Sequence, residues 1–559
     1  MKKIVSLILC VVMVLSVACL SAFAAPEGTA IKTAEEFAAM KADGTYYLDA
    51  DIKLTSTYVE AFTGTLDGNG HTVTITAPMF AEFNGTVSNL TIDGAELRGN
   101  EDLAPLAVFT KAFKAYNVTN KVDVTVTGAD EAVTTGLNAG GLVAKAVYDT
   151  DSLCFLRNCK NYGKITVETA IPNPEKAATS GDHYETHAGG FVGLADGFNA
   201  KFCENYGEIT ASGDNGQAGG FVGRAAGSAL FTHFDVHDSI SKANVTGGLD
   251  AGGIAGYIGV GNNNIYEPYT VKYCVVTGTI SAGYRGGGFL GYAYASGKNL
   301  TYYIEVTDSI FVGDVCGGRV ALTPEGKDRF SFISLFVGYS NSVWNTIARC
   351  VGMGELKALT GEGFNTPFKV MMGCSSADTP NMPFENNFIC DNNTTEWYSY
   401  ATSESNAARR IELATAISEA KVERCTADEI KNGTIMSKLN AAAGDEIFSQ
   451  KVGTDEYPVI SEKTLAKHAE QDISDPDDTT TEEVTTPSET SKKDDTTTTP
   501  KPDEGTTTPK PSQETTTPKP SESTTAGNTG KSGCGSVVAL SMLALVIPAA
   551  VVVLKKKEN

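Results

Sequence analysis

A repeated pair of glycines followed by apolar residues is the feature that most constrains the fold of this chain. The pair recurs at irregular spacings of about 30 to 50 residues, and the order of features inside each unit is kept. Self-similarity at such a period is typical of repeat folds, in which each unit buries its apolar face against its neighbours. Clear copies are Gly140–Val143, Gly189–Gly193, Gly219–Gly223, Gly252–Gly256 and Gly287–Gly291, and degenerate copies are Ser334–Gly338 and Lys369–Gly373.

A second element follows each glycine pair. Cys159–Thr166 matches Cys203–Thr210 almost residue by residue, and weaker copies start at Ser239, Cys274, Ser309 and Cys350. Each unit therefore predicts about three short strands separated by glycine or polar turns, and helical periodicity is nearly absent between residues 119 and 373. Short repeated strands without helices suit either a parallel β-helix or a propeller.

The opening segment favours the β-helix. Glu35–Met40 predicts a short capping helix ahead of a strand at Thr45–Leu48. Gly64–Val73 and Val87–Ile92 resemble the N-terminal rungs of pectin-lyase-like right-handed β-helices. We therefore predict an all-β fold: a right-handed parallel β-helix (solenoid) with a small helical and β C-terminal cap, a disordered Thr/Pro stalk and one C-terminal transmembrane helix.

The Gly-Gly-Phe-Val-Gly units resemble the GLUG-repeat family of bacterial surface proteins over about residues 30 to 400. This sequence departs from the pattern where Ala144 replaces the last glycine of the first copy, and where the sixth and seventh copies lack the glycine pair. The resemblance implies the β-helix fold and a place on the surface of a Gram-positive cell. It implies no catalytic residues.

Both ends of the chain predict export and anchoring. Lys2 and Lys3 precede an apolar run, and Ala22–Ala24 supplies a cleavage site, so residues 1–25 are predicted to be a signal peptide. Ser536–Leu554 is uncharged and long enough to cross a bilayer, and the lysines that follow it favour the cytoplasmic side. We expect an anchor at residues 533–554 and a cytoplasmic tail at 555–559, with a GPI-type signal as the alternative.

Residues 471–532 are predicted to form a disordered stalk. They repeat Thr-Thr-Thr-Pro-Lys-Pro, as at Thr497–Pro502, and such a segment cannot bury apolar surface. No Leu-Pro-x-Thr-Gly sorting signal precedes the anchor, and Gly533–Gly535 resembles the tails of some Gram-positive surface proteins. The predicted location is therefore extracellular, with the body tethered to the membrane by one helix.

The body divides into three predicted parts: an N-terminal cap with the first rungs at residues 26–118, repeats at 119–400, and a C-terminal cap at 401–470. The cap is expected to cover the open end of the solenoid. Thr426–Asn440 predicts one helix, in which Thr426 and Glu429 form a capping box. Phe448–Gln450 and Tyr457–Ile460 predict a last strand.

The cysteines indicate an internal column rather than a disulfide framework. Of twelve, Cys10 and Cys19 lie in the signal peptide and Cys534 lies beside the anchor, which leaves nine in the body. Cysteine and serine alternate at one repeat position, as expected for a small side chain stacked in the core. Disulfides between stacked neighbours remain the alternative. The net charge of −23 disfavours nucleic acid as a partner.

Two triplets could hold a metal, although polar surface is the simpler interpretation. Alternation on a strand would place three ligands on one face, as zinc or copper requires. Phe234 and Val236 are expected to point inward, which would leave the second triplet in solvent. The two triplets should lie on different corners, so no metal and no cofactor is predicted. The triplets are His183, Glu185 and His187, and His233, Asp235 and His237.

Aromatic residues gather in the turns that follow the glycine pairs. If each repeat is one rung, these turns stack along one corner, where aromatic faces suit sugar rings or a protein partner. Packing against the solenoid wall is the alternative. The candidate binding residues are Tyr257, Tyr266, Tyr269, Tyr292, Tyr294, Tyr302, Tyr303, Tyr339 and Trp344.

The predicted function is display or adhesion at the cell surface, through binding of an extracellular glycan or a surface protein. A structural role in the envelope is one alternative, and a polysaccharide lyase or glycoside hydrolase on the same fold is another. Catalysis is disfavoured because the middle rungs are expected to carry glycine and apolar residues where a catalytic sheet needs charges, and no paired carboxylates recur at facing positions.

Overall fold

The structure is a computed structural model. It describes residues 26–128, 136–147, 154–169, 185–213, 215–226, 233–260, 269–295, 303–318, 331–341, 344–359, 368–369, 372–374, 384–390 and 422–473. The chain divides into two compact units, residues 1–482 and 483–559. The second unit lies wholly outside the described residues, as do the predicted signal peptide and anchor. No helix within the described ranges is long and apolar enough to cross a membrane.

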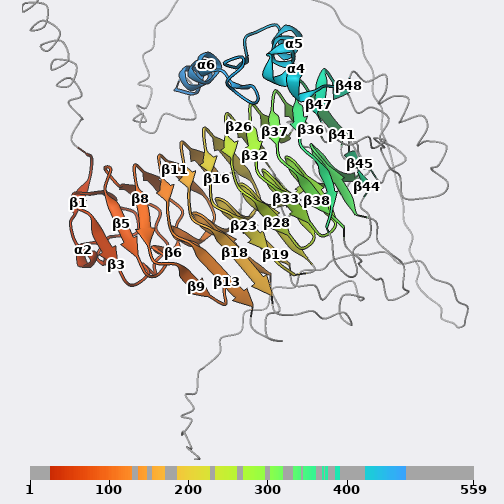
Figure 1. Ribbon diagram of the computed structural model, residues 1–559. Coiled ribbons are helices and arrows are strands. Elements are labelled where there is room, and N and C mark those ends of the chain that lie inside the picture. Colours follow the sequence, from red (N-terminus) through yellow and green to blue (C-terminus); the bar gives the residue numbers. More distant parts are fainter. Residues whose placement is uncertain are drawn as a thin grey trace, which may run out of the picture. The chain divides into compact units, whose positions relative to one another are not determined.

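The described part of the first unit is a parallel β-helix, in which successive turns of the chain stack and pair in parallel (Figure 1). A complete rung passes through five sheets, here numbered in the order in which the chain meets them. One such rung is Cys154–Arg157 (β16), Lys160–Asn161 (β17), Ile165–Thr169 (β18), Thr186–Gly189 (β19) and Val192–Ala195 (β20). The expectation of about three strands per unit was wrong, because bends that keep a rung compact divide it into five short strands.

Sheets 1 and 2 run through the whole solenoid, and each has 12 strands. Sheet 1 contains β1 (Thr29–Ile31), β2 (Thr45–Leu48), β4 (Thr65–Asp67), β7 (Thr86–Ser88), β11 (Phe113–Tyr116), β16, β21 (Phe198–Lys201), β26 (Phe234–His237), β31 (Tyr269–Lys272), β36 (Tyr303–Thr307), β41 (Trp344–Ala348) and β46 (Phe384–Glu385). Sheet 2 contains β3 (Ile52–Leu54), β5 (Thr72–Ile75), β8 (Thr91–Gly94), β12 (Thr119–Asn120), β17, β22 (Glu204–Asn205), β27 (Ile240–Ser241), β32 (Val275–Thr277), β37 (Ile310–Val312), β42 (Val351–Met353), β47 (Asn387–Cys390) and β48 (Val422–Arg424).

Sheets 3, 4 and 5 have 8, 7 and 9 strands. Sheet 3 contains β9 (Leu97–Gly99), β13 (Val124–Gly128), β18, β23 (Ile209–Ala211), β28 (Val245–Gly247), β33 (Ile280–Ala282), β38 (Val315–Gly317) and β43 (Leu356–Ala358). Sheet 4 contains β14 (Leu137–Gly140), β19, β24 (Gly216–Gly219), β29 (Asp250–Gly252), β34 (Arg285–Gly287), β39 (Phe332–Ser334) and β44 (Phe368–Lys369). Sheet 5 contains β6 (Phe80–Glu82), β10 (Ala107–Thr110), β15 (Val143–Ala146), β20, β25 (Val222–Ala226), β30 (Ala255–Val260), β35 (Leu290–Ala295), β40 (Val337–Asn341) and β45 (Met372–Cys374).

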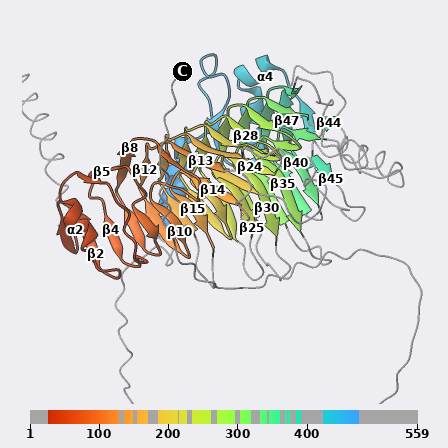
Figure 2. The same ribbon diagram turned by 90° about the horizontal axis from the view of Figure 1, so that it is seen from below.

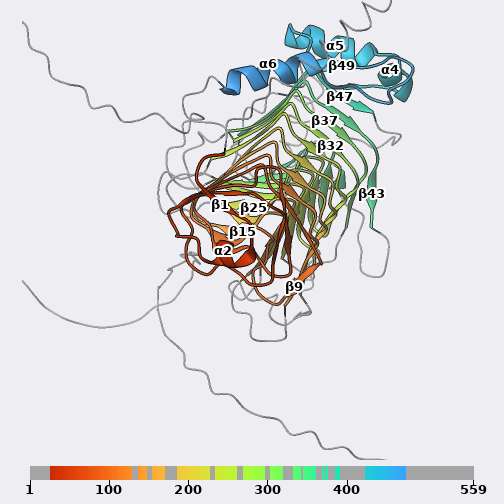
Figure 3. The same ribbon diagram turned by 90° about the vertical axis from the view of Figure 1, so that its left-hand side faces the viewer.

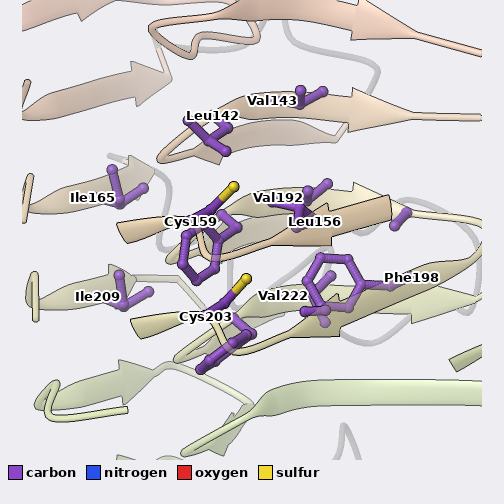
Figure 4. Close-up of a cluster of buried hydrophobic side chains, with 14 of the residues drawn as sticks. Leu142, Val143, Leu156, Cys159, Ile165, Val192, Phe198, Cys203, Ile209 and Val222 are labelled. Carbon is purple, nitrogen blue, oxygen red and sulfur yellow. The ribbon is translucent and has the colours of Figure 1, made fainter. Parts of the chain in front are cut away.

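Like residues stack along the core, as Figure 4 shows for Cys159 above Cys203 and Ile165 above Ile209. These side chains are fully buried, and each large apolar one contributes about 1.5–3 kcal/mol through burial. The predicted inward thiol column is confirmed, since Cys159, Cys203, Cys274 and Cys350 are buried thiols. Ser239 stands in the same column, where its Oγ accepts a hydrogen bond from the Cys203 amide at 3.0 Å.

A column of buried asparagines lies two positions after the thiols. Asn120 Nδ2 donates to Asn161 Oδ1 at 2.8 Å, and Asn161 Nδ2 donates to Asn205 Oδ1 at 2.9 Å. The glycine pairs pass close to these amides: a Cβ on Gly190 would lie 2.0 Å from the Gly220 carbonyl oxygen and 2.7 Å from the Asn205 side chain. Glycine is therefore required where the chain bends between sheets 4 and 5.

The corner between sheets 1 and 2 repeats one conformation in each rung from β4 to β47. A single non-glycine residue there has φ between 49° and 55°, a region in which Asn and Asp are enriched. This shared turn keeps the angle between the two sheets constant along the stack. The residues are Asn69, Asn89, Asn117, Asn158, Phe202, Asp238, Tyr273, Asp308, Arg349 and Asn386.

The N-terminal capping helix is confirmed as α2 (Ala34–Ala38), and its Phe37 is buried. At the other end, the predicted capping box between Thr426 and Glu429 is also confirmed. The single helix expected at residues 426–440 is wrong: Gly433, with φ of 79°, divides it into α4 (Ala427–Lys431) and α5 (Thr434–Ala443). A third helix, α6 (Glu462–Ile473), runs through the predicted boundary between cap and stalk.

The C-terminal segment also departs from the predicted end cap. β49 (Phe448–Ser449) and β50 (Val459–Ile460) pair antiparallel with each other instead of forming a last strand of the solenoid. The helices pack on the outer face of sheet 2, which carries apolar side chains from several rungs, so this segment covers a flank, and β48 alone extends the stack (Figure 3). The residues of this interface include Val275, Ile310, Val351, Phe388, Ile430, Ile435 and Leu439.

Candidate functional site

The bend between sheets 4 and 5 brings together outward-facing side chains from both sheets, whose strands run in neighbouring rows (Figure 2). On sheet 4, Leu137 and Ala139 point into the core, so Asn138 between them points outward. Its register partners follow on successive rungs. We call this the sheet 4 row: Asn138, His187, Gln217, Asp250 and Arg285. The facing residues of sheet 5 form the sheet 5 row: Lys145, Leu194, Arg224, Tyr257, Tyr292 and Tyr339.

The sheet 4 row is polar and yet buried, with exposed fractions of 0–9%. Buried polar groups are costly unless they are hydrogen-bonded, so each of these side chains needs a partner. Two separate hydrogen-bonded chains supply most of them, one centred on Asn138 and the other on Asp250.

The first chain runs from Asp102 through Asn138 to His187. Asn138 Nδ2 donates to both Asp102 oxygens at 2.9 and 3.0 Å, and its Oδ1 lies 2.7 Å from His187 Nδ1. Burial raises the pKa of Asp102, although donation by Asn138 opposes that shift. Burial lowers the pKa of His187, which favours its neutral form. The other ring nitrogen of His187, Nε2, has no protein hydrogen-bond partner.

The second chain runs from Arg285 through Asp250 to Gln217. Arg285 Nε and Nη2 donate to the two Asp250 oxygens at 2.5 and 2.9 Å, and Gln217 Nε2 donates to Asp250 Oδ2 at 2.9 Å. Burial raises the pKa of Asp250, and the charge of Arg285 opposes that shift. Gln217 Oε1 has no protein partner. The first chain therefore ends beside Glu185, whose Oε2 lies 3.6 Å from His187 Nε2, and the second ends at the unpaired Gln217 Oε1 on the next rung.

The sheet 5 row places cations against aromatic rings. Arg285 lies 3.5 Å from the centroid of the Tyr292 ring, and Arg224 lies 4.6 Å from that of Tyr257. Arg224 Nη1 also lies 2.6 Å from Glu185 Oε1. Burial opposes the ionisation of Glu185, but the neighbouring His187 and Arg224 lower its pKa to about 2. Glu185 is the most open member of this group, with 46% of its side chain exposed.

The aromatic residues predicted to share one corner lie in different places in the structure. Tyr257, Tyr292 and Tyr339 are register neighbours in the sheet 5 row, and Tyr294 packs beside them. Tyr269 lies instead in the core, 3% exposed and against Phe234.

The side chains of the remaining aromatic candidates lie outside the described structure. Tyr303 and Trp344 are paired residues of sheet 1, and their side chains lie outside the described structure. Tyr266 and Tyr302 lie outside the described residues altogether. Four of the nine predicted aromatic residues therefore lie at the bend.

The two metal triplets have members on different sheets: His187 lies on sheet 4, and Asp235 and His237 lie on sheet 1. His183 lies outside the described residues, whereas His187 Nε2 lies 3.6 Å from Glu185. The second triplet is on sheet 1 with Phe234 and Val236 inward, as expected.

His237 of the second triplet contacts a carboxylate outside the triplet. His237 lies 2.7 Å from Asp238. Asp238 also lies 2.8 Å from His468 of α6. Within the described ranges, no group of three or more His, Cys, Asp or Glu side chains is arranged to hold a metal ion.

Most members of the sheet 4 row were missed from sequence, and the expectation of glycine and apolar residues in the middle rungs is wrong for this row. The signal is a polar residue two positions before each glycine pair. It was overlooked because the side chain differs in every repeat, as in Gln217-Ala-Gly-Gly and Asp250-Ala-Gly-Gly. Alternation on the strand then places that residue outside the core.

Comparison with known proteins assigns the chain to no family. No protein-family model matches the chain. Halomucin from Haloquadratum walsbyi (strain DSM 16790 / HBSQ001) is 39% identical over 101 residues, which are 16% of this chain and 1% of that protein. The crystal structure of a candidate immunoglobulin A1 protease from Bacteroides ovatus is 15% identical, with a TM-score of 0.29 and coverage of 78% of this chain and 94% of that one.

The class of the protein follows from its own strands: it is a mainly β protein whose stacked sheets form a parallel β-helix. The chain spans about one hundredth of the length of the curated protein that it matches. Assignment to the GLUG-repeat family therefore stays a prediction.

Proposed function

We propose that this chain is a cell-surface β-helix protein that binds an extracellular glycan at the bend between sheets 4 and 5, and so serves display or adhesion. The sequence supports the location through its predicted signal peptide, stalk and anchor, and the glycine-pair repeats support a right-handed, GLUG-like solenoid. The body would then stand away from the membrane on its stalk.

The single observation that carries the proposal is the meeting of two unlike rows at one bend. Sheet 4 contributes hydrogen-bonding groups, and sheet 5 contributes Tyr257 and Arg224 beside the partly exposed Glu185. Sugar-binding sites need this combination, because a pyranose ring has an apolar face that packs on aromatic rings and hydroxyls that need hydrogen bonds. Loss of a ring that stacks on a sugar should weaken binding without turnover of the sugar.

The test is a binding and cleavage screen of the full chain against bacterial and host polysaccharides. We expect saturable binding without product release, and we expect Tyr257→Ala to weaken it at least about tenfold. Tyr162→Ala is the matched control, because Tyr162 is 48% exposed and stacks on Tyr206 away from the bend. No binding by the wild-type chain would favour the structural alternative, whereas released product would favour a lyase or hydrolase.

A further inference from the structure

We infer that Cys390 and Cys425 form a cross-linking site, at which a disulfide-bearing oxidant converts two stacked thiols into one disulfide and fastens the C-terminal segment to the solenoid. The inference goes beyond the proposed function, because it concerns the last rungs of sheet 2 and not the bend between sheets 4 and 5. It depends on three features of the pair: its register, its exposure and its position in the chain.

The two cysteines are stacked at the end of sheet 2. β48 pairs in parallel with β47, and Ile389 lies opposite Arg424 (Figure 1). Cys390 and Cys425 are the next residues along the chain and therefore form the next pair. The ladder continues here, because the Cys425 amide donates to the Ile389 carbonyl at 2.9 Å. Register partners are about 4.8 Å apart, within the range of about 4.4–6.8 Å between Cα atoms that a disulfide requires.

Both thiols lie on the outer face of sheet 2, beneath the C-terminal segment. Ile389 points into the core at 1% exposure, so alternation turns Cys390 outward. Cys425 belongs to the cluster of apolar side chains between sheet 2 and the helices, and Cys390 packs against that cluster. Burial raises the pKa of Cys425 to about 12, and the neighbouring Cys390 thiol adds to this shift. The two side chains are therefore neighbours on one face, and no strand has to slide to join them.

Exposure distinguishes this pair from the stacked thiols of the core. Cys159 and Cys203 are also neighbours in register, but both are fully buried and their sulfur atoms donate to backbone carbonyls. Cys390 is partly exposed, whereas Cys425 is 8% exposed. An oxidant therefore reaches Cys390 first, and the inner pair stays reduced.

The reaction consists of two exchanges and consumes one disulfide of the oxidant. The Cys390 thiol loses its proton, and its sulfur attacks the oxidant disulfide, which releases one thiol and leaves a mixed disulfide on Cys390. The Cys425 thiol then loses its proton, attacks the Cys390 sulfur and releases the second thiol of the oxidant. The protein gives up two hydrogens with their electrons, and the oxidant gains them.

The position of the pair determines what the bond would hold. Cys425 immediately precedes Thr426, the N-cap of α4, so a bond at Cys425 fixes the start of the helical part of the C-terminal segment. It joins positions 390 and 425, a separation of 35 residues, and closing a loop of that length restricts the unfolded chain. The predicted anchor follows this segment, so the cross-link would keep the segment on the solenoid when the chain is pulled from that end.

The experiment treats the reduced, folded full chain with oxidised glutathione, stops exchange with acid, and then unfolds and alkylates the protein for peptide mass spectrometry. We expect one cross-linked product, in which the peptides of Cys390 and Cys425 are joined with loss of two hydrogens. Cys159 and Cys203 should be recovered as alkylated thiols. The cross-linked chain should also unfold at a temperature about 2 °C or more above that of the reduced chain.

Single substitutions separate the two exchanges. Cys425→Ser should accumulate the mixed disulfide of Cys390 with glutathione, and Cys390→Ser should slow reaction at Cys425 at least about tenfold, because Cys425 is buried. Cys316→Ser is the matched control, since Cys316 is also partly exposed but has Ser281 and Lys357 as its register partners. It should leave the cross-link unchanged.

Two results on the wild-type chain would overturn the inference, whether or not a variant folds. One is recovery of both Cys390 and Cys425 as alkylated thiols after treatment of the folded chain. The other is a mixed disulfide on Cys390 that does not pass to Cys425. Neither result bears on glycan binding at the bend, so the proposed function stands or falls separately.

Discussion

Two columns of buried polar side chains run along this solenoid, and they find their hydrogen-bond partners in different ways. Inside sheet 2, Asn120, Asn161 and Asn205 repeat one residue type, and each amide bonds to the next. Outside sheet 4, the residue changes at every rung, and Gln217 Oε1 has no protein partner. In both columns an unpaired polar atom stands where the residue type changes: Ser241 Oγ follows Asn205 inside sheet 2, and Gln217 Oε1 follows His187 outside sheet 4. Identical residues on successive rungs can pair with one another, and this is how the scaffold satisfies buried amides.

The largest effect should come from breaking the ion pair in the sheet 4 row. Asp250→Leu leaves Arg285 buried beside apolar and aromatic groups without its carboxylate, and loss of one partner of a buried pair costs about 3–5 kcal/mol. Denaturant unfolding should show this decrease in the free energy of unfolding. The double variant Asp250→Leu/Arg285→Met should recover most of the loss, and an unrecovered loss would mean that the pair does more than neutralise a buried charge.

The second prediction concerns the internal column. Asn161→Leu removes hydrogen bonds to both neighbouring asparagines and to the Gly163 carbonyl. Each buried group left unpaired costs about 1–3 kcal/mol, so the free energy of unfolding should fall clearly. Glycan binding by the folded fraction should stay unchanged. Gln217→Met removes a single hydrogen bond to the Asp250 carboxylate, which keeps both of its bonds from Arg285, so the loss of stability should be smaller, about 1.5 kcal/mol.

The sequence predicted the β-helix because its signals repeat. Glycine is imposed at each bend by contacts such as that of Gly190 with the next rung, and the inward thiol column follows from alternation of Cys and Ser. The residues of the site do not repeat from one rung to the next. His187, Gln217 and Asp250 share a position but no chemistry, and only the register of the strands shows that they are neighbours.

The other errors have physical causes of the same kind. The apolar residues of 426–473 do not show by themselves whether they pack on the side of the solenoid or on its open end. The side surface that they cover is built from Val275, Ile310 and Val351, which lie on separate rungs of sheet 2. The aromatic prediction placed Tyr269 outside, but its strand register turns the ring into the core.

A smaller effect is expected in the thiol column. Cys203→Ser should change the free energy of unfolding by only about 1 kcal/mol, because Ser239 already occupies the equivalent place and donates to the carbonyl two residues earlier at 2.8 Å. Cys203→Leu is the contrast, since overpacking a filled core costs about 1–3 kcal/mol. Thermal unfolding of the two variants would measure the difference. Equal losses would contradict the view that this column requires only a small side chain.

The smallest effect should depend on pH, and it concerns Glu185, which lies beside His187 of the sheet 4 row. The folded-state pKa of Glu185 is lowered from 4.5 to about 2, so its ionised form favours the folded state at any pH above its unfolded pKa. That contribution should be lost as pH falls from about 4.5 to about 2, and solvent screening keeps it small because the side chain is 46% exposed. Glu185→Gln should therefore be less stable than the wild-type chain near neutral pH and equal to it near pH 2. Unfolding curves recorded across this range test the sign: a difference that grows on acidification would mean that Arg224 does not stabilise this carboxylate. The internal asparagine column carries no titratable group, so Asn161→Leu should lower stability by the same amount at every pH in the range.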